Sequence, residues 1–208
     1  MKLSGGLPCC TGMESSSFTF RADARDPLAA RIAAGDPSAP EELVRRYRTG
    51  LLRYARALLG SGVAAEDAVQ AAFERAFVAL GGYEAERIAA LQLRPWLYRI
   101  TLNVVRNAWR SGGREVVLAK PPESEEPRGA DRADWLAALE ALGRLSERQR
   151  VAVALRYLED LSYAEISAAT GWPQSTCKTS VRRGLRRLGA LLCEEPGNRE
   201  KRGAEDER

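Results

Sequence analysis

The sequence predicts an all-α fold made of two small helical domains joined by a flexible linker, the second domain being a helix-turn-helix. Apolar residues recur every three or four positions in two separate blocks, which is the spacing of one face of a helix. No stretch shows the two-residue alternation that is typical of a β-strand. Residues 113–131, between the blocks, combine Gly, Pro and mixed charge with few apolar side chains, a composition typical of a linker.

The first block begins at Asp26-Pro27, an N-cap carboxylate followed by proline at the first helical position. A short helix to about Ala33 is expected, then a turn at Gly35-Asp36-Pro37. Three longer helices follow, over about 43–59, 65–80 and 95–110, each ended by glycine. The expected core stripe of the 65–80 helix is Val69, Ala72, Phe73, Ala76, Phe77 and Leu80.

The second block, 132–194, contains four predicted helices. They cover 135–142, 147–158, 163–170 and 174–192. Ser146 with Gln149, and Ser162 with Glu165, have the spacing of a capping box. The turn Gly171-Trp172-Pro173 between the last two helices predicts a helix-turn-helix. Outside both blocks, we expect 1–25 to be a disordered extension and 195–208 a frayed, charged tail.

Composition excludes several classes of function. The 208 residues are 45% apolar and carry a net charge of +4, which is ordinary for a soluble chain. The sequence has no histidine, which excludes the common catalytic triads and His-ligated metals. The four cysteines form no CxxC pair, which disfavours a zinc site. No apolar run approaches the length of a membrane span. We therefore expect a cytoplasmic protein that is no enzyme, with no cofactor, metal, small-molecule substrate or membrane insertion.

A polar stripe runs along the 95–110 helix, opposite its apolar face. It consists of Arg99, Asn103, Arg106 and Arg110, with Trp96 at its edge. Guanidinium groups neutralise phosphates and an aromatic ring stacks on unpaired bases, so this pattern fits nucleic acid with unstacked bases. A solvated helix face beside a core tryptophan explains the same pattern about equally well.

A second basic surface lies on the 174–192 helix, and no acidic residue occurs between Glu165 and Glu194. Its outer residues are Ser175, Lys178, Thr179, Arg182, Arg183 and Arg186. Such a face suits entry into the DNA major groove, with early residues at base edges and later arginines at phosphates. The alternative is an ordinary helical hairpin with a basic exterior.

The 65–80 helix carries the opposite charge on its exposed side, at Glu66, Asp67, Gln70 and Glu74. These residues could form a docking face for a basic protein surface. Stabilisation of the positive N-terminal end of the helix is a sufficient structural reason for Glu66 and Asp67.

The order of these features resembles the extracytoplasmic-function (ECF) group of the sigma-70 family of RNA polymerase sigma factors, over about 26–192. Residues 65–77 look like the family's helix that docks on core polymerase. Residues 93–110 look like the helix that recognises and melts the promoter −10 element, and 145–188 look like the domain that reads the −35 element.

The resemblance implies a function and a set of roles. Regions 2 and 4 of the family correspond to 26–112 and 132–194. Glu66, Asp67, Gln70 and Glu74 become candidate contacts to bacterial core polymerase. The 95–110 stripe becomes a candidate site for melted promoter DNA. Unstacked bases of its non-template strand would lie between that helix and a loop at 82–93. The 174–192 surface becomes the candidate site for duplex −35 DNA. Such proteins are often held inactive by an anti-sigma factor.

One rival interpretation remains from the residues alone. A stand-alone helix-turn-helix regulator, with an N-terminal helical domain for sensing or dimerisation, also explains 145–188. It gives no reason for an arginine stripe beside Trp96 in the first block.

Overall fold

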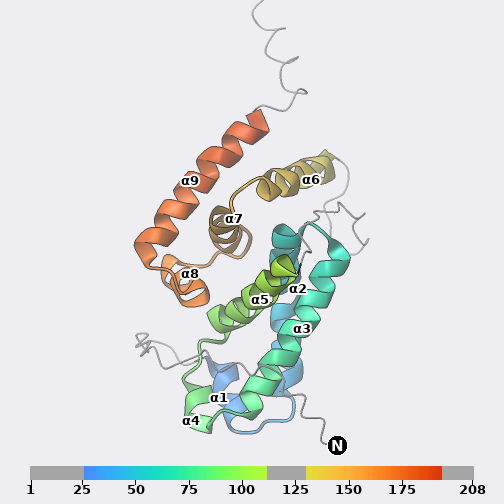
Figure 1. Ribbon diagram of the computed structural model, residues 1–208. Coiled ribbons are helices and arrows are strands. Elements are labelled where there is room, and N and C mark those ends of the chain that lie inside the picture. Colours follow the sequence, from blue (N-terminus) through green and yellow to red (C-terminus); the bar gives the residue numbers. More distant parts are fainter. Residues whose placement is uncertain (1–25, 112–129, 194–208) are drawn as a thin grey trace, which may run out of the picture.

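The computed structural model describes residues 26–111 and 130–193, with side chains from 135 onward in the second range. Every regular element in these ranges is a helix, so the all-α prediction is confirmed there. The first group holds α1 (Pro27–Ala33), α2 (Ala39–Leu59), α3 (Gly62–Gly81), α4 (Ala85–Ala89) and α5 (Leu93–Arg110). The second holds α6 (Ala130–Gly143), α7 (Glu147–Val153), a π-helical turn η1 (Ala154–Leu158), α8 (Tyr163–Thr170) and α9 (Gln174–Cys193) (Figure 1). The predictions for 1–25, 195–208 and nearly all of the linker lie outside the described residues.

The helices α2, α3 and α5 pack against one another around the core of the first group. Their apolar residues are spaced by three and four, so each helix buries one face; Leu51, Leu58 and Leu97 are fully buried. Burying such a leucine contributes roughly 1.5–3 kcal/mol. The rings of Tyr54 and Tyr98 meet edge to face at 5.3 Å, which locks α2 against α5.

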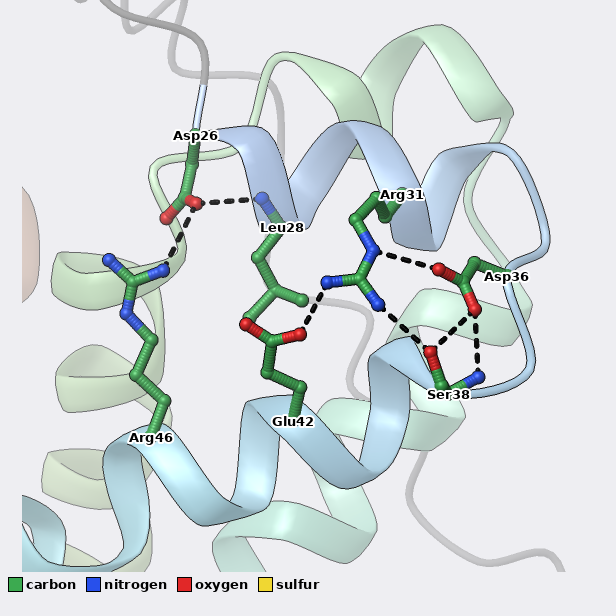
Figure 2. Close-up of polar contacts among 7 residues, drawn as sticks. All are labelled: Asp26, Leu28, Arg31, Asp36, Ser38, Glu42 and Arg46. Atoms are coloured by element: carbon green, nitrogen blue, oxygen red, sulfur yellow. Dashed lines mark hydrogen bonds and ion pairs between the residues drawn. The ribbon is translucent and has the colours of Figure 1, made fainter.

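Polar side chains hold α1 across the start of α2 (Figure 2). The carboxylate of Asp26 accepts a hydrogen bond from the Leu28 amide at 3.0 Å, so the predicted N-cap is confirmed. From the last turn of α1, the Arg31 guanidinium donates to Asp36 at 2.7 Å and also contacts Glu42. These bonds set the angle at which the chain enters the long α2 helix.

In the second group, α9 packs along α7 and lies against α8. Gly171 ends α8 with a φ of +77°, a left-handed conformation that glycine adopts without strain. Gly184 lets α9 approach α7 closely, since a Cβ there would lie 2.6 Å from Cγ2 of Val153. Both predicted capping boxes are present, with Ser162 bound to the Glu165 amide at 3.2 Å.

Two local predictions are wrong, and a third is correct in extent but incomplete. The expected loop at 82–93 contains α4, whose five residues are too few to show a helical period in sequence. The expected helix at 147–158 is present, but from Ala154 its last turn is π-helical, and the apolar spacing does not reveal a single wider turn. Phe77, expected in the core, is 36% exposed and stacks on Phe73 at the surface.

Candidate nucleic-acid interface

The polar stripe of α5 divides into exposed and covered parts. Asn103 and Arg110 are exposed, whereas Arg99 and Arg106 are half-buried because α5 packs against α8 of the second group. The Arg106 Nε donates to Glu147 at 2.9 Å, and its guanidinium lies 5.8 Å from the centre of the Trp172 ring. The stripe exists as predicted, but part of it faces protein.

Trp96 belongs to a cluster of aromatic and cationic side chains, and only Trp96 itself was predicted from the sequence. Its ring is half-buried and lies 6.4 Å from the ring of Tyr83. The Arg87 guanidinium of α4 stacks over Tyr83 at 3.7 Å. Because two rings and a cation form a stacking surface for bases, Tyr83 and Arg87 join the candidate site. Tyr83 and Arg87 are four positions apart in the sequence, and this spacing of an aromatic and a basic residue is the signal that could have indicated the pair.

The outer face of α9 is as predicted. Ser175, Lys178, Arg182, Arg183 and Arg186 are exposed, and Thr179 is half-buried with its hydroxyl donating to the Ser175 carbonyl at 2.9 Å. Figure 1 shows α9 along the outer edge of the second group, away from α1–α4. The basic face can therefore reach a large ligand such as duplex DNA.

A surface hollow of about 390 Å³ lies between α7 and α9. Its lining includes the hydroxyls of Ser146, Ser175 and Thr176 and the guanidinium groups of Arg148 and Arg183. Hydroxyls and arginines together are typical of phosphate contacts. Arg148 lies on a different helix from the basic face, so sequence spacing does not link the two, and only the fold brings them together.

The predicted acidic face of α3 is exposed throughout. Glu66, Asp67 and Glu74 point outward with Gln70, whose amide donates to Glu74 at 3.1 Å. Large apolar side chains flank these residues at both ends of the helix. They are Val63, Val78 and Phe77, with exposed fractions of 67%, 79% and 36%. Exposed apolar side chains of this size next to polar ones are compatible with a protein-docking surface.

The two groups of helices share one buried apolar cluster, and a group of polar side chains that sequence spacing does not predict lies within their contact. The Glu159 carboxylate is buried there, 4% exposed, and accepts hydrogen bonds from Tyr98 and from Arg53, the latter at 2.9 Å. Burial raises the pKa of Glu159, and burial beside Glu159 raises the pKa of the Tyr98 phenol, which therefore remains a donor.

A cavity of about 790 Å³ opens at the other end of this interface. It lies between the end of α5, at Arg106 and Trp109, and Arg150 of α7. The Arg150 guanidinium donates to the carbonyls of Leu58, at 2.9 Å, and Leu145, at 3.3 Å. Burial lowers the pKa of Arg150, and its bond to the Leu58 carbonyl ties α7 to the end of α2.

Within 26–111 and 130–193, no helix combines the length and apolarity needed to cross a bilayer. The same ranges hold no cluster of three or more Cys, Asp or Glu side chains arranged to bind a metal ion.

Comparison with protein families matches both groups of helices. Residues 43–115 match the family described as Sigma-70 region 2, and residues 135–188 match Sigma-70, region 4. The first match contains the α3 face and the α5 stripe, and the second contains the helix-turn-helix.

Individual relatives extend this similarity over most of the chain. The RNA polymerase sigma-E factor of Streptomyces avermitilis is 33% identical over 159 residues, 76% of this chain and 87% of the relative. The ECF RNA polymerase sigma factor SigD of Mycobacterium tuberculosis is 31% identical over 188 residues, 84% of this chain and 86% of the relative.

Solved structures are similar in fold as well as in sequence. CnrH in complex with the cytosolic domain of CnrY has a TM-score of 0.63 and 28% identity, covering 81% of this chain and 96% of that one. The sigma factor RpoE of Bartonella quintana, in complex with the anti-sigma factor NepR, has a TM-score of 0.58 and 27% identity, covering 74% and 99%.

Proposed function

Because this chain belongs to the ECF sigma factors of the sigma-70 family, we propose roles in promoter binding for its individual residues. As a sigma factor it is no enzyme: it directs RNA polymerase to specific promoters at the start of transcription. The observation that carries the residue assignments is the presence of two separate basic surfaces, on α5 and α9, beside an acidic and apolar face on α3. We assign 26–112 to region 2, 113–131 to the linker and 132–194 to region 4.

The α5 surface is assigned to the −10 element and its melting. Arg99, Arg106 and Arg110 neutralise phosphates of the non-template strand, and Asn103 offers both a donor and an acceptor to bases. Trp96 with Tyr83 supplies the stacking surface for bases that leave the duplex. Extruding a base costs a few kcal/mol, which stacking of about 1–3 kcal/mol per base helps to offset.

The α9 face is assigned to the −35 duplex. Ser175, Lys178, Thr179 and Arg182 lie in the first half of the helix, the part that enters the major groove in a helix-turn-helix. Arg183 is assigned to the major groove with them. Arg186 is assigned mainly to phosphates, together with Arg148 beside the hollow. Contacts to phosphates set register and affinity, whereas contacts to base edges set specificity.

The acidic α3 face is assigned to core polymerase. Asp67 and Gln70 stand at its centre, with Glu66 and Glu74 beside them and apolar side chains at each end. This combination fits a basic partner surface with apolar edges. We assign the protein to the bacterial cytoplasm, where core polymerase works. The complexes of CnrH with CnrY and of RpoE with NepR support an anti-sigma factor as a further partner.

The test is run-off transcription with purified protein and bacterial core polymerase on a pool of genomic promoter fragments. Discrete transcripts that depend on the protein, and that fade with the Asp67→Lys/Gln70→Ala variant, are expected. Glu140→Lys, an exposed charge change on α6, is the matched control and should transcribe normally. Specific duplex binding without any stimulation of polymerase would instead favour the stand-alone regulator.

A further inference from the structure

The cavity between the end of α5 and the start of α7 has the size and lining of a site for a small ligand. Its volume is about 790 Å³, within the range of about 300–1,000 Å³ that is usual for such sites. The apolar part of its lining includes Leu58, Leu59, Leu145 and the half-buried ring of Trp109. The polar part includes Arg106, Arg110, Arg150, Ser146 and Glu147. Apolar walls with a few convergent polar groups are typical of a ligand pocket.

The charges around this cavity do not balance. Among the lining residues that the structure describes, three are arginines and one, Glu147, carries a carboxylate. Glu147 forms an ion pair with Arg106 at 2.9 Å. Arg110 donates to neutral acceptors of its own helix, the Arg106 carbonyl at 3.4 Å and the side chain of Asn107. The positive charges of Arg110 and Arg150 therefore have no carboxylate partner within the described part of the chain.

Three backbone carbonyls fix Arg150 as one wall of the cavity. Its guanidinium donates to Leu58 at 2.9 Å, to Leu145 at 3.3 Å and also to Gly143. Its Nε is buried and finds no acceptor among the described residues. Carbonyls hold the guanidinium in place without neutralising it, and a partly buried cation is costly unless an anion pairs with it. An anion in the cavity would supply the missing charge, and this arginine is already oriented before the anion arrives.

Trp109 adds a flat aromatic surface to these cations. It lies in the last turn of α5, next to Arg110, and its ring is 6.0 Å from the Arg150 guanidinium. An aromatic ring is a stacking surface for a nucleobase of any kind. Guanidinium groups are the preferred partners of phosphates, which they bind through two parallel hydrogen bonds. The ring and the cations thus match the two ends of a nucleotide, the base and the phosphates.

We propose that this cavity binds a nucleoside diphosphate, whose base lies on Trp109 and whose phosphates bind Arg110 and Arg150. Two phosphate groups supply the negative charge that these two arginines lack. Residues of α2, α5 and α7 all line the cavity, so a bound nucleotide stabilises the folded protein. The inference goes beyond the proposed function, because binding requires neither polymerase nor promoter DNA.

The experiment is isothermal titration calorimetry of the full-length protein with ADP as the probe. The buffer contains no divalent cations, because these would cover the phosphates. Adenosine and pyrophosphate, the two halves of the probe, are titrated separately. ADP should bind about tenfold or more tighter than either half, because the base and the phosphates engage different parts of the cavity. Its affinity should fall as salt concentration rises, since salt screens the attraction between phosphates and arginines.

Four variants test whether ADP binds in this cavity. Arg110→Gln removes a charge whose described bonds lie within its own helix, so the fold should persist while ADP affinity falls about tenfold. Trp109→Leu should weaken binding at least about fivefold, whereas Trp109→Phe keeps a ring and should retain most of the affinity. Arg183→Gln is the matched control, because it removes an exposed arginine that lines the other hollow, between α7 and α9. It should bind ADP as the wild type does.

Two further readouts locate the base and check the fold. Stacking of adenine on Trp109 should quench tryptophan fluorescence in the wild type, and this quenching should be absent in Trp109→Phe although the variant still binds. ADP should raise the midpoint of thermal unfolding of the wild type, because it binds the folded state. The rise should be smaller for Arg110→Gln and unchanged for Arg183→Gln. Circular dichroism confirms that each variant keeps its helix content.

Three results would overturn the proposal. The first is a dissociation constant for ADP weaker than about 1 mM, because the cavity would then hold no nucleotide of this class. The second is pyrophosphate binding as tightly as ADP, because the ring would then contribute nothing. The third is a loss of affinity with Arg183→Gln but not with Arg110→Gln, because ADP would then lie on α9. None of these results bears on the assigned roles at the promoter, which run-off transcription tests separately.

Discussion

The phenol of Tyr98 in α5 donates a hydrogen bond to the buried carboxylate of Glu159, a residue 61 positions later in the chain. This bond joins the helix with the arginine stripe to the helices that carry the second basic surface. Because it lies in the contact between the groups, its strength bears on how readily they separate.

Removing this donor should weaken the structure measurably. Tyr98→Phe keeps the ring against Tyr54 but leaves one oxygen of Glu159 without its partner. A buried acceptor that loses its partner costs about 1–3 kcal/mol, so the free energy of unfolding should fall by that amount in urea titrations. Tyr47→Phe is the control, since its hydroxyl makes only a long 3.4 Å contact to Asp26. Equal losses in both variants would contradict the prediction.

The aromatic site should distinguish melted from duplex DNA. Trp96→Ala removes a stacking surface worth about 1–3 kcal/mol per base, so holoenzyme should bind a fork-shaped promoter with an unpaired −10 strand roughly 5- to 150-fold more weakly. Binding to the same promoter as a closed duplex should change much less. Trp96→Phe, which keeps a ring beside Tyr83, should recover most of the loss. If fork and duplex are affected alike, Trp96 has only a structural role.

On α9, substitutions should separate base contacts from phosphate contacts. Lys178→Ala should cost about 1–3 kcal/mol on the preferred promoter and relax the sequence preference there. Arg186→Ala should weaken holoenzyme binding to all promoters alike and reduce the salt slope by about 0.9. Competition binding across promoter variants at several salt concentrations measures both. The assignments are reversed if Arg186→Ala changes the sequence preference and Lys178→Ala does not.

The corner between α1 and α2 should show acid sensitivity. The pKa of Asp36 is lowered from 3.8 to about 2. The hydrogen bond from Arg31 is the largest cause, and the hydrogen bonds from Ser38 are the next. Since the folded pKa is depressed, this stabilisation is present above the unfolded pKa and is lost as pH falls from about 4 through 2. In urea titrations, the wild type should exceed Asp36→Asn in stability at pH 7, and the difference should vanish near pH 2. A difference independent of pH would exclude this ion pair as its source.

The contact of α9 with α7 should tolerate no added methyl group. Gly184→Ala places a Cβ against Val153, and such overpacking costs about 1–3 kcal/mol, partly offset by the better helix propensity of alanine. Gly189→Ala, where nothing lies within 4 Å, should instead stabilise the protein by up to about 1 kcal/mol. Combining Gly184→Ala with Val153→Ala should cost less than the sum of the two, as thermal unfolding would show.

Much of the fold could be predicted from local pattern. The cap at Asp26, the capping boxes and the apolar spacing of the long helices depend on residues within a few positions of one another, and these agree with the structure. The same spacing placed Asp67, Asn103 and Lys178 on exposed faces, where they lie. Whether these faces bind polymerase and DNA as assigned stays a prediction.

The sequence by itself determined which residues form helices and which side of each helix is polar, because helical periodicity is a property of neighbouring positions. Only the tertiary structure decided what covers those polar sides. It set Arg106 against Glu147, exposed Phe77, and buried Glu159 beside Tyr98 and Gly50. These contacts join residues tens of positions apart, and no local spacing encodes such pairs, because a charge on a helix face is equally compatible with water, a phosphate or a carboxylate from another part of the chain.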